Sequence, residues 1–299
     1  MPHVDVDGVK LYYEETGEGT PLLFLHEFAG DHRSWEAQVG AFARDHRCIV
    51  AANRGYPPSD APEAAEAYDQ AIINRDAIAV MDAAGIDKAH VIGLSMGAYT
   101  ALQLALEFPE RLLSAVVASG GSGSYKPTRE AFVAEVLVAA DHLAEAGEIP
   151  AEAFGLGATR VQLLVKDPPA WRLFVERLAE HPARPAAQIL RRIQVKRPSL
   201  YDQEEGLRAV ETPVLLVVGD EDESCLDVNL FLKRLMPAAQ LAMLPGCGHA
   251  LNLEEPRLFA DIVGRFLASV DRGTWRPRDP RARGDVHTAL GMGGREADG

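Results

Sequence analysis

The stretch "VIGLSMGAYTALQLAL", residues 91–106, runs from an apolar strand into a helix through the turn Gly93-Leu94-Ser95-Met96-Gly97. The residues before the turn are continuously apolar, and those from 97 to 108 have the spacing of a helix. A glycine on each side of the serine lets the strand and the helix approach closely in a sharp turn. The sequence therefore predicts that Ser95 lies strained at the tip, with its hydroxyl exposed beside a helix N-terminus.

Strands and helices alternate along most of the remaining chain. Residues 4–15 alternate around an Asp7-Gly8 turn and predict an edge hairpin. Apolar runs predict buried parallel strands at 22–25, 48–52, 89–94, 113–118, 213–218 and 240–244. Helical spacing predicts helices at 72–84, 97–108, 227–236 and 257–270. This order is typical of an α/β protein with a doubly wound, mostly parallel sheet.

One connection is much longer than a parallel crossover requires. Residues 120–212 separate two strands, although a crossover needs only about a dozen residues plus its helix. We therefore expect a helical cap at 124–207, inserted after the sixth strand into a core of residues 1–123 and 208–270. Apolar residues at helical spacing are expected to form a small core in this cap or to line a pocket: Phe132, Leu137, Phe154, Leu164, Trp171 and Phe174.

Composition restricts the partners and the compartment. The 299 residues are 47% hydrophobic and 25% charged, with a formal net charge of -14. Nucleic-acid binding needs clustered Lys and Arg, so the acidic excess argues against such a partner. Residues 271–299 are rich in Arg, Gly and Pro, which predicts a disordered or loosely attached tail. The three cysteines have no metal-ligand spacing and are expected to be free thiols: Cys48, Cys225 and Cys247.

The N-terminus and the hydropathy pattern argue against a membrane protein. The start "MPHVDVDGVK" has neither the basic nor the apolar region of a signal peptide. No later run reaches the roughly 18 apolar residues of a membrane span. We therefore expect a cytoplasmic protein.

A nucleophilic serine needs a base, and the base needs an orienting acid. His249, in "LPGCGHALNLEEP", directly follows the last strand, and the preceding glycines let its loop fold over the sheet edge. Among the other histidines, His90 opens a strand and His26 ends one. Four more are expected in polar or helical surface contexts: His46, His142, His181 and His287. His249 is therefore the best candidate for the base.

The acid is expected in the loop after the preceding strand, "VLLVVGDEDESCLD". Asp220 and Asp222 compete for this role, and Glu221 and Glu223 are more distant options. The chain order Ser, Asp, His is the order expected of an α/β-hydrolase.

The chain resembles the capped α/β-hydrolase superfamily over roughly residues 4–270. The turn around Ser95, "GDED" and "GCGHALNLEEP" carry the resemblance, and "NRGYPPSD" at 53–60 is similar to a looser family segment. In that family the acid is usually the fourth residue of a G-x-x-D turn. The resemblance therefore implies Asp222 as the acid, with Asp220 second.

The same resemblance implies an oxyanion hole. The family usually has H-G-x-x-G after its third strand, and "HEFAG" at 26–30 stands in that position. The N–H groups of Phe28 and Met96 are then expected to point at the substrate carbonyl oxygen. Glu27 departs from the family glycine. Because an inward, unpaired carboxylate would oppose oxyanion formation, we expect Glu27 to point away or to be paired, with Arg54 as the suggested partner.

The nucleophile type restricts the chemistry. Haloalkane dehalogenases and epoxide hydrolases of this fold use Asp, whereas Ser95 suits acyl transfer to water. The resemblance therefore implies a serine hydrolase that cleaves a small, apolar carboxylic ester or lactone. Three alternatives stay open: carbon–carbon bond hydrolysis, cofactor-free oxygenation or perhydrolysis, and a ligand receptor on the hydrolase fold. The sequence has no phosphate loop, metal-ligand cluster or dinucleotide motif, so we expect neither a cofactor nor a metal.

Overall fold

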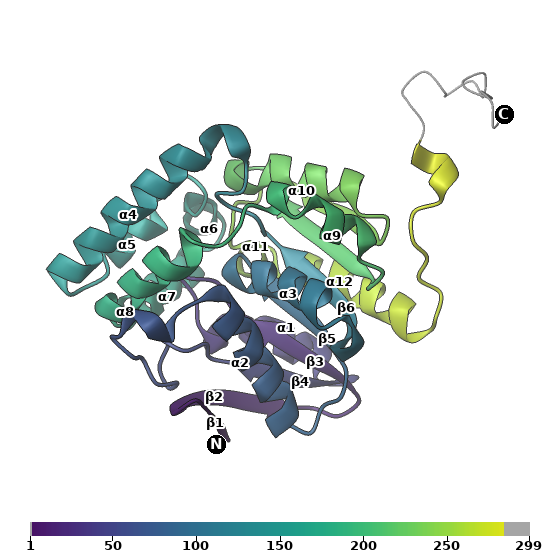
Figure 1. Cartoon of the computed structure of the whole chain (residues 1–299), viewed down its shortest axis with the longest axis horizontal. Coiled ribbons are helices and arrows are strands. Elements are labelled where there is room, and N and C mark those ends of the chain that lie inside the picture. The colour runs from purple at the N-terminus through teal and green to yellow at the C-terminus, as the bar shows by residue number, and fades with distance from the viewer. Residues whose placement is uncertain (1, 284–299) are drawn as a thin grey trace.

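The structure is a computed structural model that describes residues 2–283. Within these residues, eight strands form one sheet in the order β1-β2-β4-β3-β5-β6-β7-β8 (Figure 1). The strands from β3 to β8 pair in parallel, whereas β1 pairs with β2 and β2 with β4 antiparallel. Their bounds are His3–Val6 (β1), Val9–Thr16 (β2), Thr20–Leu25 (β3), His46–Ala51 (β4), Ala89–Leu94 (β5), Leu112–Ala118 (β6), Val214–Gly219 (β7) and Ala239–Leu244 (β8).

The predicted hairpin is present. Asp7 and Gly8 both have positive φ, 55° and 81°, which is the backbone that a two-residue turn between right-twisted strands requires. Each predicted strand overlaps one of β3 to β8, and the expected mostly parallel, doubly wound sheet is confirmed.

Helices cover both faces of the sheet because alternate residues of each buried strand point to opposite sides. Leu23 and Val91 pack on one face with α2 (Gln70–Ala83), α3 (Met96–Glu107) and α10 (Glu223–Leu235). Phe24 and Ile92 pack on the other face with α1 (Glu36–Phe42) and α12 (Pro256–Asp271). Both faces are therefore buried, which explains why these strands are continuously apolar.

The strand order reverses beside β3. From β3 the chain moves to β4 on one side, and it then returns to β5 on the other side of β3. In open α/β sheets, ligands bind in the crevice outside the carboxyl ends of the strands at such a switch point. Here the loop after β3 and the turn after β5 meet at that point, with Leu25 opposite Gly93.

A helical insertion follows β6, as expected (Figure 1). It contains α4 (Arg129–Ala146), α5 (Ala151–Gly155), α6 (Val161–Lys166), α7 (Pro168–Ala179), α8 (Ala183–Ile189) with a π-helical turn at Leu190–Gln194, and α9 (Glu204–Ala209). Its apolar core includes Phe174, with Phe154 and Trp171 packed partly buried against it, whereas Leu137 is exposed. Ala29 of the loop after β3 belongs to the same cluster, so this core extends onto the carboxyl edge of the sheet.

The C-terminal segment follows α12. Asp271 still belongs to α12, and the Arg278 N–H donates to the Pro237 carbonyl at 2.9 Å. A short turn follows at Pro280–Arg283 (η7). The part of the expected tail from 284 to 299 lies outside the described residues.

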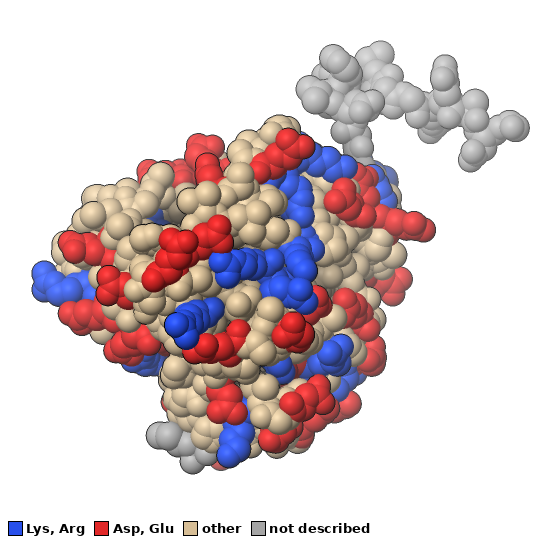
Figure 2. All heavy atoms as spheres, turned by 60° about the vertical axis from the view of Figure 1, so that its left-hand side comes forward, with Lys and Arg blue, Asp and Glu red and all other residues tan. Residues whose placement is uncertain are grey.

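Two further observations concern the charge of the surface and the hydropathy of the helices. Figure 2 shows Lys and Arg side chains interspersed with Asp and Glu over one face of the molecule. In the described part of the chain, no helix is long and apolar enough to cross a membrane.

Candidate active site

Ser95 lies at the tip of the turn between β5 and α3. Its backbone has φ 53° and ψ -106°, a strained conformation for a residue with a side chain. The Ser95 N–H donates to the Ala118 carbonyl of β6 at 2.8 Å, which holds the strained residue against the neighbouring strand end. A side chain at position 93 would collide with the Gly97 backbone, and one at position 97 would collide with the Leu25 backbone. The glycines are therefore needed for close approach of strand and helix.

Two main-chain N–H groups flank this turn at the switch point. Phe28 follows β3, and Met96 is the first residue of α3, where helix N–H groups have no partner within the helix. Among the main-chain hydrogen bonds of turns, loops and helix caps in residues 2–283, neither N–H is a donor. These are the two donors that the sequence predicts for an oxyanion hole.

Buried side chains hold the loop after β3 in shape. His26 Nε2 accepts from the Asn53 N–H at 3.0 Å, so Nδ1 carries the proton that is donated to the Glu27 carbonyl at 2.7 Å. Burial lowers the pKa of His26 to about 4, which keeps this tautomer neutral at pH 7. The Tyr56 hydroxyl donates to the Phe28 carbonyl at 2.9 Å. The hydrogen bonds from His26 and Tyr56 therefore hold the Glu27 and Phe28 carbonyls, on either side of the Phe28 N–H.

Asp222 and His249 come together after β7 and β8. Asp222 Oδ2 lies 2.8 Å from His249 Nδ1, and both residues are buried. The Ser224 hydroxyl donates to the other carboxylate oxygen at 2.8 Å. Asp220 is instead exposed and accepts from the Cys247 N–H at 3.2 Å. The structure therefore brings Asp222, and not Asp220, to the imidazole.

The electrostatics of this pair favour its charged form. Burial lowers the pKa of His249, but the Asp222 carboxylate and its hydrogen bond outweigh burial and raise that pKa above its ordinary value. Burial raises the pKa of Asp222, and the interaction with His249 more than reverses this effect. The imidazole is thus a stronger base than a free one.

The histidine loop has an acidic support that the sequence reasoning did not identify. Buried Glu254 accepts from the Gly248 N–H at 2.7 Å and from the Ala250 N–H at 3.1 Å. It therefore binds the N–H groups on both sides of His249. A carboxylate five residues after a loop histidine, inside the motif "GCGHALNLEEP", is the signal that points to this role.

Glu27 is paired, but its partner differs from the one suggested by the sequence. Arg160 donates to Glu27 Oε1 at 2.9 Å through Nη1 and to Oε2 through Nη2. Arg54 instead forms a bidentate pair with Asp76 of α2 at 2.5 and 2.6 Å, so the suggested Arg54 pairing is wrong. Burial raises the pKa of Glu27, but Arg160 outweighs burial and lowers it below the ordinary value. The carboxylate is therefore ionised.

Two histidines expected at the surface lie elsewhere. His181 is buried, with Nε2 3.4 Å from Asp31 Oδ2 and its ring 5.1 Å from the ring of Tyr56. His46 opens β4 and is half-buried. His142 is exposed on α4, and His287 lies outside the described residues. His181 is buried because the insertion covers the loop after β3.

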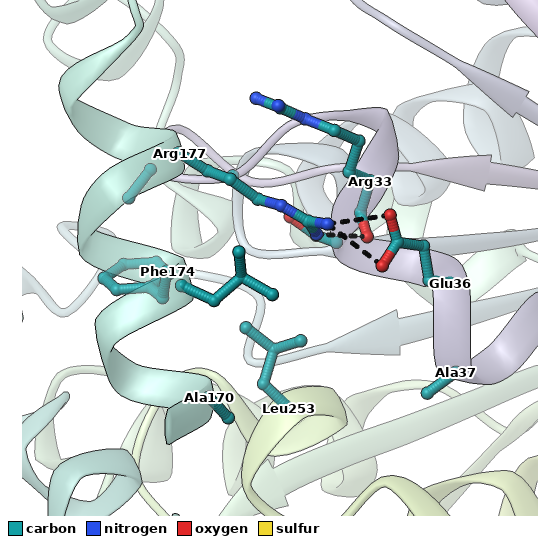
Figure 3. Close-up of a pocket in the computed structure, with 11 residues that line it drawn as sticks. Arg33, Glu36, Ala37, Ala170, Phe174, Arg177 and Leu253 are labelled. Atoms are coloured by element: carbon teal, nitrogen blue, oxygen red, sulfur yellow. Dashed lines mark hydrogen bonds and ion pairs between the residues drawn. The ribbon is translucent and has the colours of Figure 1, made fainter. Parts of the chain in front are cut away.

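A cavity of about 130 Å³ lies beside the two candidate loops. Ala29 and Gly30 line it from the loop after β3, and Leu253 lines it from α11 (Leu251–Glu254), just after His249. Figure 3 shows Arg177 of α7 reaching Glu36 of α1 across this space, with contacts of 2.8 and 3.0 Å. Ser95 and His249 are not in its lining, so the cavity adjoins the candidate site and is separate from it.

In the described part of the chain, one group of side chains is close enough to hold a metal ion. The ligand atoms of Asp222, Cys225 and His249 lie within 4.8 Å of one another. A metal ion would have to replace the short Asp222–His249 hydrogen bond, so the donor set fits an acid–imidazole pair better than a metal centre. The three cysteines are free, as expected.

Comparisons with known proteins find hydrolases that match most of the chain. The chain is 25% identical over 255 residues to 3-oxoadipate enol-lactonase 1 of Acinetobacter baylyi, covering 83% of this chain and 89% of that protein. It is 29% identical over 273 residues to 2-hydroxy-6-oxo-6-phenylhexa-2,4-dienoate hydrolase of Burkholderia cepacia, covering 87% and 92%. A solved structure of Est816, described as an N-acyl homoserine lactone degrading enzyme, matches with a TM-score of 0.72 and 27% identity, covering 89% and 100%. The model of the alpha/beta hydrolase fold family matches residues 20–256, and the chain belongs to that family.

Proposed function

We propose that this protein is a serine hydrolase that cleaves a small carboxylic ester or lactone through an acyl-enzyme. Ser95 is the nucleophile, His249 the general base and Asp222 the acid that orients it. Phe28 and Met96 supply the oxyanion donors. The observation that carries the proposal is the Asp222–His249 contact of 2.8 Å at the carboxyl edge of the parallel sheet, the same edge that presents the strained Ser95 backbone.

In the first half-reaction, His249 Nε2 takes the Ser95 hydroxyl proton while Oγ forms a bond to the carbonyl carbon. The carbonyl oxygen becomes negative and accepts from the N–H groups of Phe28 and Met96. The intermediate then breaks its bond to the alkoxy oxygen. His249 returns the proton to that oxygen, and the alcohol leaves.

In the second half-reaction, water replaces the serine as nucleophile. His249 takes a water proton while the hydroxide adds to the acyl carbon, and the same two N–H groups hold the oxyanion. Collapse of the intermediate breaks the bond to Ser95, and His249 returns the proton to Oγ. In a lactone the alcohol and the acid stay joined, so the product is one hydroxy acid.

The support for an ester or lactone comes from the relatives and from apolar residues of the insertion near the loop after β3. Two of the three proteins compared above are described as lactone-degrading enzymes, and the third as a hydrolase of a dienoate. Apolar residues from the insertion, including Phe154 and Phe174, lie next to the loop that carries Phe28. We further propose that residues 124–207 act as a cap domain over a core of 1–123 and 208–270, and that the cap side chains select an apolar acyl group.

Labelling and turnover together test the proposal. A fluorophosphonate should label the wild-type protein at Ser95, identified by peptide mass spectrometry, and should not label Ser95→Ala. Hydrolysis of a panel of short acyl esters and lactones should fall by roughly 10⁴-fold or more in Ser95→Ala, with unchanged thermal unfolding. Unchanged ester turnover in that variant would contradict the proposed acyl-enzyme at Ser95.

A dienoate added to this panel distinguishes carbon–carbon bond hydrolysis. If a dienoate with a 2-hydroxy-6-oxo group is turned over with a much higher kcat/KM than every ester and lactone, carbon–carbon cleavage is the better assignment. The dienoate hydrolase relative is the observation that favours this second candidate.

A further inference from the structure

We propose that the buried Glu27–Arg160 ion pair is a positioning device that makes the oxyanion hole depend on the cap. Glu27 directly precedes Phe28 in the loop after β3, and Arg160 precedes α6 of the insertion. The inference rests on the proposed function, because it assigns a role in presenting the Phe28 N–H. It adds two positioning residues to the site, one from the core and one from the cap.

The geometry of the pair suits a rigid link between the two parts. The contact is bidentate, with Nη1 to Oε1 at 2.9 Å and Nη2 to Oε2. Glu27 is 1% exposed and Arg160 is 7% exposed. A buried pair of this kind is poor evidence of a stability role, since apolar residues of similar volume often stabilise a protein at least as well. The pair instead fixes the relative orientation of the two side chains, because a planar guanidinium binds a carboxylate through two parallel hydrogen bonds.

The cap holds Arg160 in place from its other side. The guanidinium carbon lies 4.8 Å from the ring centre of Phe154 and 5.4 Å from that of Phe174. Both rings belong to the cluster that forms the insertion core. The arginine therefore transmits the position of the cap core to the Glu27 carboxylate.

Three contacts support the segment of chain that carries the Phe28 N–H. Its C=O, that of Glu27, accepts from His26 Nδ1 at 2.7 Å, and Tyr56 holds the next carbonyl at 2.9 Å. In a trans peptide the N–H points opposite to the C=O, so the bond to the Glu27 carbonyl sets the direction of the donor, and the Tyr56 bond holds the peptide unit that follows. Arg160 fixes the Glu27 side chain and is the only one of these three supports that comes from the insertion.

The same cap segment also contacts the histidine loop. The Thr159 carbonyl accepts from the His249 N–H at 2.8 Å. Gln162 Nε2 donates to Glu221 Oε2, beside Asp222, at 3.0 Å. Three residues of the cap within four positions, Thr159, Arg160 and Gln162, therefore touch the loops of the base, the oxyanion donor and the acid. We infer that docking of this segment assembles the site.

Single and double variants test this role. Glu27→Gln and Arg160→Met should each lower kcat for a short ester by roughly 10- to 100-fold, with a smaller change in KM, because a misplaced donor weakens only the transition state. Each single variant also leaves one group without its partner and should unfold at a lower temperature. The double variant Glu27→Gln/Arg160→Met removes both charges, so its unfolding temperature should recover while kcat stays low.

A double variant with wild-type kcat would overturn the positioning role and leave the pair a structural contact. If all three variants unfold, binding of an aryl boronic acid, which mimics the tetrahedral intermediate, is measured in Glu27→Asp. This variant keeps the charge but shortens the link, and it should bind the boronic acid at least 10-fold more weakly than wild type. Equal binding contradicts the proposal.

Two controls separate this inference from the proposed function. Arg184 of α8 pairs with Glu63 of the core at 3.3 Å, and both side chains are exposed. Arg184→Met should leave kcat unchanged, although it also removes a cap-to-core ion pair. Fluorophosphonate labelling of Ser95 in the wild type tests the acyl-enzyme by itself, so its failure is distinct from failure of the pair variants.

Discussion

Asp222 and His249 are 27 residues apart in the chain, and their side chains meet through a single short contact, Oδ2 to Nδ1 at 2.8 Å. Asp222 is the N-cap residue of α10, directly after β7, and His249 follows β8. Because β7 and β8 are parallel neighbours, their carboxyl ends lie side by side. The contact is therefore a consequence of sheet topology.

This contact predicts that Asp222→Asn reduces kcat by about 10⁴-fold without unfolding the protein. An amide nitrogen facing Nδ1 would favour the wrong imidazole tautomer, so Nε2 could no longer accept the serine proton. Asp220→Asn is the matched control. The Asp220 side chain is exposed and accepts from the Cys247 N–H. The turnover of Asp220→Asn should therefore stay within a few-fold of wild type. Reversed effects of the two variants would contradict the assignment.

The raised pKa of His249 predicts the pH dependence of turnover. The general base must be neutral, and the Asp222 carboxylate stabilises the protonated imidazole in the free enzyme. The acid limb of kcat/KM should therefore have an apparent pKa above 6.5, the ordinary value for histidine. Activity should rise through that pKa as the pH increases. An acid limb at or below 6.5 would show that burial, and not Asp222, dominates the titration.

His26 predicts how the stability of the protein depends on pH. Burial lowers the pKa of His26, whereas Asp222 raises the pKa of His249. The pKa of His26 falls from 6.5 to about 4, so the unfolded chain binds a proton in this range before the folded protein does. Wild-type stability should fall by about 3 kcal/mol from this group as the pH drops from 6.5 to 4. His26→Gln does not titrate, and its stability deficit relative to wild type should shrink over that range. Urea unfolding at several pH values measures this difference, and a constant deficit would contradict it.

Tyr56→Phe tests the support behind the Phe28 carbonyl. Removing the hydroxyl leaves this carbonyl without its donor, so stability should fall by about 1 kcal/mol and kcat should fall several-fold. Tyr68→Phe is the control, because the Tyr68 hydroxyl is also bound to a carbonyl, that of Pro62, at 2.7 Å. It should lose comparable stability and keep its turnover. Equal losses of kcat would show a general effect of packing on activity.

Local sequence was enough to predict the sheet. The strands from β3 to β7 contain short apolar runs because helices bury both faces of the sheet there, whereas the edge strand β8 is partly exposed. The turn at Ser95 was also predictable, since the closeness of α3 to β5 requires a small residue at 93 and its closeness to the end of β3 requires one at 97. Motif spacing placed His249 in its loop, but the residues alone left Asp220 and Asp222 open. Resemblance to the family favoured Asp222, and its burial against His249 agrees with that choice.

Contacts between the insertion and the core were not predictable in the same way. Glu27 and Arg160 are 133 residues apart, and Arg54 was the partner suggested from the sequence. Arg54 is instead taken by Asp76, 22 residues away on α2. Burial of His181 also depends on how the insertion covers the loop after β3. Hydrophobic periodicity specifies which face of an element is buried, but it carries no information on which distant side chain completes a buried charge. The sequence thus determined the elements and the nucleophile turn, and the tertiary structure decided the ion pairs, since pairing requires two segments to meet in space.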